Sequence, residues 1–217
     1  FRKAAGFDLP KEKQIETVLS ERFKSVSPIF SVSYKNPIYM ESAAFQYMFD
    51  KFGNSYLDAY NNIPHVGHSH PKVVNAGQRQ MAQLNTNTRY LYDGLAEYAE
   101  KLLAKFPSSL NKVFFVNSGS AASDLAMRMA KFHTASEHIM VMEAGYHGNT
   151  QSSIDISDYK FNNPKGQGQK GHIIKTKIPD TYKGTYTSKD ENPGMLYAQE
   201  AVEQIKNSKV PISAFIC

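Results

Sequence analysis

The chain has 217 residues, of which 41% are hydrophobic and 21% charged, and it carries a net charge of +5 near neutral pH. These values are typical of a globular protein of one or two domains, and no stretch approaches the ~20 apolar residues that a membrane-spanning helix needs. The lysines are scattered and lack interleaved aromatic residues, which excludes a single-strand nucleic-acid binder. The single cysteine, Cys217, excludes an internal disulfide and favours a reducing compartment, so we expect a cytoplasmic protein.

Three helices and a group of short strands are predicted in the first half of the chain. Residues 10–26 have the apolar spacing of an amphipathic helix, and residues 37–60 have the pattern of short strands with a turn at Gly53-Asn54. Pro71 can open a helix because its fixed φ suits the first helical position. Asp93 can cap the following helix.

From residue 113 onward, apolar strand patterns alternate with helix patterns. The expected strands are 113–117, 138–143, 172–177 and 211–217, and the expected helices are 119–132 and 194–207. This alternation is typical of an α/β fold with a mostly parallel sheet. The last segment has the apolar pattern of a buried central strand.

Residues 160–189 read as a long loop that contains one short strand and an excess of lysine over acidic residues. A solvated loop face explains this excess. An anionic substrate passing nearby is the functional alternative.

The segment 113–124 carries the most specific signal in the chain. An apolar strand pattern runs into the polar turn Asn117-Ser118-Gly119-Ser120, and a helix pattern follows at once. Such a turn points backbone N–H groups and the positive end of a helix dipole at one spot, which suits a phosphate. Gly119 allows close approach of the backbone, and Ser118 and Ser120 add hydroxyl donors. The alternative is that these residues are only helix caps.

A second motif, Ala144-Gly145-Tyr146-His147-Gly148, follows the next predicted strand. In a parallel sheet the two motifs would both lie at the carboxyl edge, where ligands bind. A phosphate-binding turn beside a ring that can stack on a flat heterocycle indicates a phosphorylated aromatic cofactor. The alternative is that Tyr146 is a core aromatic residue.

For two other groups of polar residues, the sequence favours a structural role over metal binding or nucleophilic catalysis. His65, His68 and His70 lie close together in the sequence, but no nearby cysteine or acidic ligand completes a metal site, so we expect no metal. Ser118 and His147 could form a nucleophile and base, but nothing in the sequence resembles a nucleophile elbow.

With Gly67-His68-Ser69-His70-Pro71, these two motifs resemble the class III aminotransferases, which are pyridoxal-phosphate (PLP) enzymes of fold type I. The resemblance runs over almost the whole chain. A further set of motifs is similar to the branch that holds alanine–glyoxylate aminotransferase 2-like proteins and the phospho-lyases of ethanolamine phosphate and phosphohydroxylysine. These motifs are Asp155-Ile156-Ser157, Tyr159-Lys160-Phe161, and Pro179-Asp180-Thr181-Tyr182 with Gly184. The chain departs from the family in having Ala121 where Glu is usual and Ser123 where Asn is common.

The resemblance implies a fold, a cofactor and a set of roles. It implies an α/β fold of PLP type I, with residues 1–66 contributing to the small domain and residues 67–217 forming the first half of the large PLP-binding domain. It implies a homodimer with shared active sites. It places the lysine that forms a Schiff base with the cofactor, and the aspartate that pairs with the pyridine nitrogen, beyond Cys217, so the chain is expected to be an N-terminal half without catalytic residues of its own. The residues expected to bind PLP are Ser118, Gly119, Ser120, Tyr146 and His147, and the substrate candidates are Asn62, Arg89 and Tyr90.

Three functions follow from these expectations. The first is an aminotransferase that moves an amino group between an amino acid or amine and a keto acid. The second is a phospho-lyase that releases phosphate and ammonia from a phosphorylated amine, which the motifs over 155–184 and the lysine excess favour. The third is a structural domain that kept the fold without the chemistry, which Ala121 and the missing lysine favour.

Overall fold

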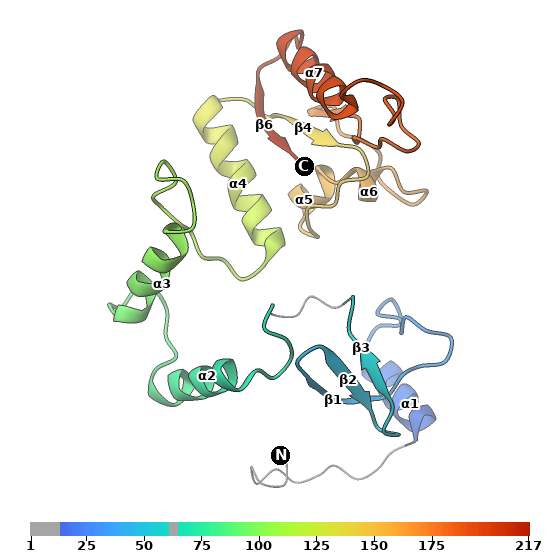
Figure 1. The fold of residues 1–217 in the computed structure, drawn as a ribbon, viewed down its shortest axis with the longest axis vertical. Coiled ribbons are helices and arrows are strands. Elements are labelled where there is room, and N and C mark those ends of the chain that lie inside the picture. Colours follow the sequence, from blue (N-terminus) through green and yellow to red (C-terminus); the bar gives the residue numbers. More distant parts are fainter. Residues whose placement is uncertain (1–13, 61–64) are drawn as a thin grey trace. The chain divides into compact units, whose positions relative to one another are not determined.

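The structure, a computed structural model, describes residues 14–60 and 65–217. The chain divides into two compact units, 1–92 and 93–217, and each has its own small sheet (Figure 1). Over the described ranges no helix combines the length and the apolar character needed to cross a membrane.

In its described residues, the first unit contains two helices and an antiparallel sheet ordered β1-β2-β3. Its elements are α1 (Ile15–Ser25), β1 (Met40–Ala44), β2 (Tyr47–Asp50), β3 (Ser55–Leu57) and α2 (Pro71–Gln83). The helix predicted over 10–26 is confirmed from residue 15 on, and its residues 10–13 lie outside the described part. The strands predicted within 37–60 and the helix opened by Pro71 are confirmed as well.

The turn between β2 and β3 is held by the side chain of Asp50. Its Oδ1 accepts hydrogen bonds from the backbone N–H groups of Phe52 and Asn54, both at 2.9 Å. Its Oδ2 accepts from the Asn54 amide at 2.8 Å and from the Tyr56 hydroxyl at 3.0 Å. Gly53 supplies the positive φ of +85° that the turn requires. The predicted turn at Gly53-Asn54 is therefore confirmed.

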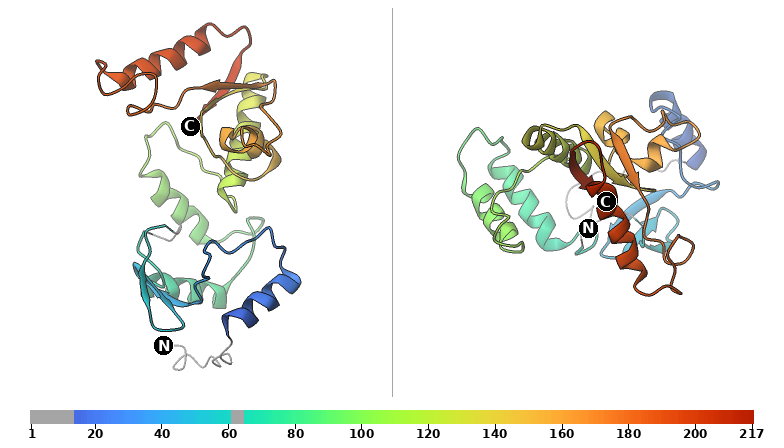
Figure 2. Two further views of the ribbon diagram at one scale, coloured as in Figure 1. Left: turned by 90° about the vertical axis from the view of Figure 1, so that its right-hand side faces the viewer. Right: turned by 90° about the horizontal axis from the view of Figure 1, so that it is seen from above.

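The second unit has the helix and strand alternation of an α/β fold (Figure 1). Its elements are α3 (Asp93–Leu103), α4 (Gly119–Thr134), β4 (His138–Met142), α5 (Gln151–Asp155), α6 (Asp158–Phe161), β5 (Ile173–Thr176), α7 (Pro193–Lys206) and β6 (Ile212–Ile216). The helices predicted from Asp93, over 119–132 and over 194–207, and three of the four predicted strands, are confirmed. Figure 2 shows α4 and α7 from two further directions.

The sheet of this unit is parallel, and β4 lies between β5 and β6. Ile139, Met140 and Val141 of β4 are all at most 1% exposed, so both faces of this strand are covered. Two of them, Ile139 and Val141, join a core with one residue each from four other elements or their flanks, namely Met127, Ile156, Phe161 and Ile173. This core packs α4, α5 and α6 against β4.

The prediction of a strand over 113–117 is wrong. These residues form no strand, and Phe114, Phe115 and Val116 are 65%, 43% and 44% exposed. The apolar pattern is present, but a strand also requires a neighbour for its backbone hydrogen bonds, and no described strand pairs with this segment. The Phe115 ring instead stacks on Tyr98 of α3, with the ring centroids 5.1 Å apart.

Two further expectations need correction. The strand predicted over 211–217 is present as β6, but it lies at the edge of the described sheet rather than at its centre, because only β4 pairs with it. Residues 151–161 contain the short helices α5 and α6, which sequence periodicity did not reveal because each is about one turn long.

Candidate functional site

Helix α4 begins with unsatisfied hydrogen-bond donors. Ser118 is its N-cap, and the Ser118 Oγ accepts a hydrogen bond from the Ala121 N–H at 3.1 Å. The Ser118 carbonyl accepts from the Ala122 N–H at 3.0 Å. Within the described residues, the N–H groups of Gly119 and Ser120 have no acceptor. Two free amides at the positive end of a 16-residue helix therefore point out of the helix start.

The loop over 144–150 lies directly against this helix start. The Asn149 N–H donates to the Ser120 Oγ at 3.0 Å, and Gly148 packs against Ser120 so closely that a Cβ on the glycine would lie 2.8 Å from the Ser120 Cα. Gly148 also has a φ of +134°, which L side chains rarely adopt. The structure thus brings together the two sequence motifs that contain Ser118 to Ser120 and Tyr146-His147.

Helix α6 holds the Tyr146 loop in place through three hydrogen bonds. The Ala144 N–H donates to Asp158 Oδ2 at 2.8 Å, and the His147 N–H donates to Ser157 Oγ at 2.9 Å. In the opposite direction, the Tyr159 N–H donates to the Gly145 carbonyl at 3.1 Å. Three consecutive residues, 157–159, therefore support the loop along most of its length.

Helix α5 supports the other side of the contact. The Ser153 Oγ, in a fully buried residue, donates to the Ser120 carbonyl at 3.3 Å, and the Ser152 Oγ donates to Asp124 on the second turn of α4. The start of α4 is thus bonded both to α5 and to the loop over 144–150.

The sequence alone did not identify Ser152, Ser153, Ser157 and Asp158, which support the loop and the helix start, as functional residues. A weak signal for them was present, because Ser157-Asp158 ahead of an aromatic pair is the composition of a helix start. Their role as supports depends on contacts between segments distant in the sequence, which composition does not reveal.

The carboxylates of Asp158 and Glu143 are both paired with Lys175. Lys175 Nζ lies 3.3 Å from Asp158 Oδ1 and 3.8 Å from Glu143 Oε1, and the Asp158 side chain is 8% exposed. This pair fixes the carboxylate that receives the Ala144 N–H, so Asp158 links β5 to the Tyr146 loop.

The predicted cofactor residue His147 has a partly buried imidazole. Burial lowers the pKa of its imidazole, because desolvation disfavours the charged form. Its Nε2 is buried and has no hydrogen-bond partner within the described chain. The ring packs over Gly145, where a Cβ would approach Nε2 to 2.9 Å. An imidazole nitrogen without a hydrogen-bond partner among the described residues therefore lies next to the loop backbone.

Tyr146 is accessible. It is 55% exposed, and its ring meets that of Tyr159 edge to face, with the centroids 6.1 Å apart. The Lys160 Nζ lies 5.4 Å from the centroid of the Tyr146 ring. The alternative interpretation of Tyr146 as a core aromatic is therefore wrong for this chain.

The histidine motif belongs to the first unit. His68 Nε2 lies 2.6 Å from Asp58 Oδ2, so an acidic partner is present that the local sequence did not suggest. The His68 backbone bridges to Phe45, and His70 precedes α2 with its ring 6.0 Å from that of Phe45. Among the described residues, no three His, Cys, Asp or Glu side chains converge as a metal ion would require.

The substrate candidates also fall in or near the first unit. Arg89 Nε and the Arg89 N–H both donate to Asn87 Oδ1, at 3.2 and 3.0 Å, and Tyr90 is 64% exposed. Asn62 lies outside the described residues. Arg89 and Tyr90 therefore show local turn contacts, and their role as substrate residues stays a prediction.

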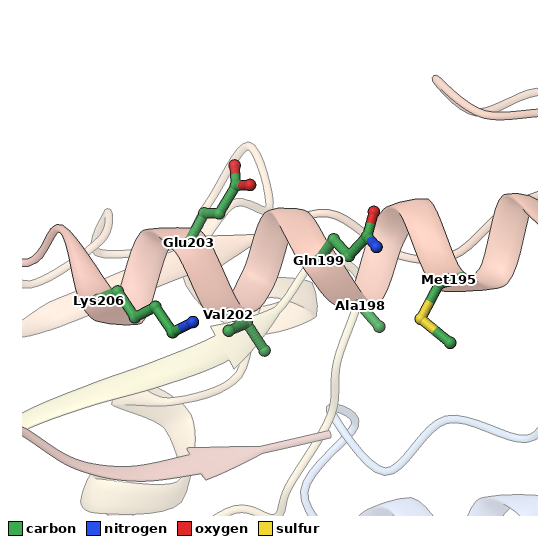
Figure 3. A pocket seen from close by; sticks show the side chains of 6 residues that line it. All are labelled: Met195, Ala198, Gln199, Val202, Glu203 and Lys206. Atoms are coloured by element: carbon green, nitrogen blue, oxygen red, sulfur yellow. The ribbon is translucent and has the colours of Figure 1, made fainter.

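A shallow hollow lies along one side of α7 (Figure 3). It is lined by Met195, Ala198, Gln199, Val202, Glu203 and Lys206, all from that helix. None of the predicted site residues takes part in it.

The fold and this site define the class of the protein. A family model described as aminotransferase class-III matches residues 29–217, so the chain belongs to the class-III aminotransferase family. The family and fold expected from the sequence motifs are confirmed.

Individual relatives refine the picture. The chain is 44% identical over 178 residues to an alanine–glyoxylate aminotransferase 2-like protein of Drosophila melanogaster. The aligned part is 79% of this chain and 36% of the relative. It is 35% identical over 187 residues to ethanolamine-phosphate phospho-lyase homolog 1 of Caenorhabditis elegans, covering 84% of this chain and 40% of the relative. The chain therefore spans less than half the length of these curated relatives.

Solved structures show the same fold. An Arthrobacter phospholyase in complex with phosphoethanolamine matches with a TM-score of 0.73 and 34% identity, over 87% of this chain and 43% of that one. A taurine:2-oxoglutarate aminotransferase of Bifidobacterium kashiwanohense, in complex with PLP and glutamate, matches with a TM-score of 0.77 and 21% identity, over 95% of this chain and 48% of that one. At this identity, the second match is a likeness of fold alone.

Proposed function

We propose that this chain supplies the phosphate and ring contacts of a PLP-dependent class-III aminotransferase, which transfers an amino group between an amino acid or amine and a keto acid. The observation that carries the proposal is the start of α4. Two backbone N–H groups without an acceptor in the described residues and two serine hydroxyls meet there, in direct contact with the loop that bears Tyr146.

The residues present fit the cofactor. Ser118 Oγ and Ser120 Oγ each accept one hydrogen bond from the backbone, and neither hydroxyl proton has an acceptor within the described chain. Together with the amides of Gly119 and Ser120, they offer four donors to a phosphate at a helix start. The exposed Tyr146 ring lies in the adjoining loop, together with the His147 Nε2, which has no hydrogen-bond partner in the described residues.

The departure at Ala121 does not remove these donors. Its N–H is used by the Ser118 cap, and its side chain takes no part in the free amides. The phosphate contacts are backbone and serine contacts, so the replacement of the usual Glu leaves them in place.

These residues hold and orient rather than catalyse. In our proposal Ser118, Gly119 and Ser120 bind the phosphate, while Tyr146 covers one face of the ring with His147 beside it. PLP, when bound, supplies the electron sink for amino-group chemistry. The family resemblance assigns the lysine that binds the cofactor, and the carboxylate for its pyridine nitrogen, to positions other than residues 1–217.

A phospho-lyase acting on a phosphorylated amine is the second candidate. It is supported by the relative named as an ethanolamine-phosphate phospho-lyase homolog and by the 34% identity to the Arthrobacter phospholyase. Release of phosphate and ammonia from ethanolamine phosphate by the purified full protein would select this reaction. A shift of the cofactor spectrum with an amino donor, reversed by a keto acid, would select transamination.

The cofactor assignment is tested by adding a carboxylate at the helix start. In the full protein, Ser120→Glu places a negative charge beside the phosphate, and we expect PLP binding on the order of 10²–10³-fold weaker, because like charges a few ångström apart repel by several kcal/mol. Ala126→Glu adds the same charge at an exposed position further along α4 and serves as the control. Equal PLP affinity in both variants would refute the phosphate site.

Borohydride reduction of the full protein, followed by peptide mapping, tests the same proposal without an activity assay. A pyridoxyl label on a lysine is the expected result. A wild-type protein with neither label nor cofactor absorbance would leave only a structural domain without the chemistry.

We also propose the finer properties expected from the sequence. These are a cytoplasmic location, a homodimer with shared active sites, and a domain boundary between residues 66 and 67. The single cysteine supports the location, whereas the relatives named as mitochondrial in Arabidopsis thaliana and Homo sapiens favour a mitochondrial one. Cell fractionation and sedimentation analysis of the full protein test the first two properties.

A further inference from the structure

Lys160 is placed over two aromatic rings at the Tyr146 loop. Its Nζ lies 5.4 Å from the centroid of the Tyr146 ring and 6.0 Å from that of Tyr159. The two rings are perpendicular to one another, with the centroids 6.1 Å apart. Both distances from the cation are within the ~6 Å at which an ammonium group is attracted to an aromatic face.

The position of Lys160 relative to Tyr146 is fixed by the backbone. Lys160 and Tyr159 belong to α6, and the residues at the start of this helix bond to the loop through Ala144, Gly145 and His147. The helix and the loop therefore form one hydrogen-bonded unit. The ring of Tyr146, although 55% exposed, contacts both the Lys160 cation over its face and the perpendicular ring of Tyr159.

The charge of Lys160 is not used in an ion pair within the described chain. No carboxylate lies within salt-bridge distance of it there, and the nearest acidic residue in the sequence, Asp158, pairs with Lys175 instead. The half-buried Lys160 side chain thus has the two rings as its contacts. A solvated lysine of an ordinary loop face would leave the rings and extend into water.

We propose that Lys160 is a positioning residue that orients the Tyr146 ring for stacking on the cofactor. The inference rests on the proposed function, because the proposed function is what assigns the Tyr146 ring to stacking on PLP. By holding one face of Tyr146, the Lys160 ammonium group leaves the opposite face for a flat ligand and removes rotamer freedom before the ligand arrives. A side chain ordered in advance costs less to immobilise on binding.

The test is a double-mutant cycle in the full protein, read as the dissociation constant of PLP. Lys160→Met keeps an unbranched apolar side chain and removes the charge, and we expect PLP to bind about two- to five-fold more weakly, the range of a partly exposed cation–π contact. Lys160→Arg restores a cation that stacks on rings and should recover wild-type affinity. Lys165→Met removes a charge from an exposed lysine five residues further on and is the matched control.

The cycle is closed with Tyr146→Leu. If Lys160 acts through the ring, Lys160→Met has no further effect on PLP affinity in the Tyr146→Leu background. The circular dichroism that the protein induces in bound PLP should also change in Lys160→Met and return in Lys160→Arg, because this signal depends on how the ring is oriented.

The outcomes separate the inference from the proposed function. A wild-type protein that does not bind PLP overturns the proposed function. PLP binding that weakens in Tyr146→Leu but not in Lys160→Met overturns the role of Lys160 alone. An equal loss on Lys160→Met in both backgrounds also overturns that role, since it would show that the charge acts on the anionic ligand directly.

Discussion

Gly148 sets the contact between the Tyr146 loop and the start of α4, and its replacement by alanine tests that contact. An added Cβ would lie 2.7 Å from the Ser120 Oγ and 2.8 Å from the Ser120 Cα. Carbon atoms pack favourably at about 3.5 Å, so the backbone of the loop would have to move by roughly 0.7 Å. Rotation of the serine side chain does not relieve this clash, because the Cα of Ser120 is itself too close.

The cost of Gly148→Ala has two parts. The φ of +134° costs an alanine about 1–3 kcal/mol, and overpacking against α4 costs about 1–3 kcal/mol. We therefore expect the free energy of unfolding to fall by about 2–6 kcal/mol. The displaced loop also moves Tyr146 away from the helix start, so the affinity for PLP should fall in parallel.

Urea denaturation of the full protein, with and without PLP, measures both effects. Gly94→Ala is the control, because Gly94 lies in α3 with open space where the added methyl group would sit, and the change should alter stability by no more than about 1 kcal/mol. Equal urea midpoints for Gly148→Ala and Gly94→Ala would refute the close packing of Gly148 on Ser120.

The remaining predictions concern buried polar groups of the second unit. Ser157→Ala removes the acceptor of the His147 N–H and should cost about 1–3 kcal/mol, with faster hydrogen exchange at that amide; unchanged exchange would contradict the hydrogen bond. Burial lowers the pKa of His147, so its contribution to stability is complete above the unfolded-state pKa of about 6.5 and is lost as the pH falls through the lower folded-state pKa. His147→Gln should therefore flatten the pH dependence of the urea midpoint below about pH 6.5. If the variant keeps the wild-type pH dependence, that dependence comes from groups other than His147. Tyr197→Phe removes a buried hydroxyl that bridges two backbone groups at 3.0 Å and should cost about 1–3 kcal/mol, whereas the control Tyr182→Phe, at an 84% exposed residue, should leave the urea midpoint unchanged.

Elements defined by local chemistry were predictable from the sequence. Gly53-Asn54 marks a turn because glycine adopts the positive φ and the asparagine side chain donates back to the Asp50 carboxylate, and Pro71 begins a helix because its φ is already helical. The start of α4 was predictable for the same reason, since Ser118 caps the helix three residues ahead of the amide it bonds.

The strand pattern over 113–117 shows where local chemistry is insufficient. Its apolar residues suit a strand, but strand formation requires a neighbour whose position the segment itself does not encode. Ser157 and Asp158 were missed for a related reason. Each acts through a bond to a backbone group at least 10 positions away in the sequence, and no spacing rule connects such pairs.

The sequence by itself determined the turn Asn117-Ser118-Gly119-Ser120, the loop that bears Tyr146 and the family to which the chain belongs, because these depend on residue types within short segments. The sequence predicted that both motifs lie at one edge of a sheet, but only the tertiary structure decided that they are in direct contact. Asn149 and Ser120 are 29 positions apart, and their hydrogen bond forms because the buried side chains of β4 pack with α4, α5 and α6 into one core. Packing of that core places the helix start against the loop, and no property of either motif taken alone specifies this contact.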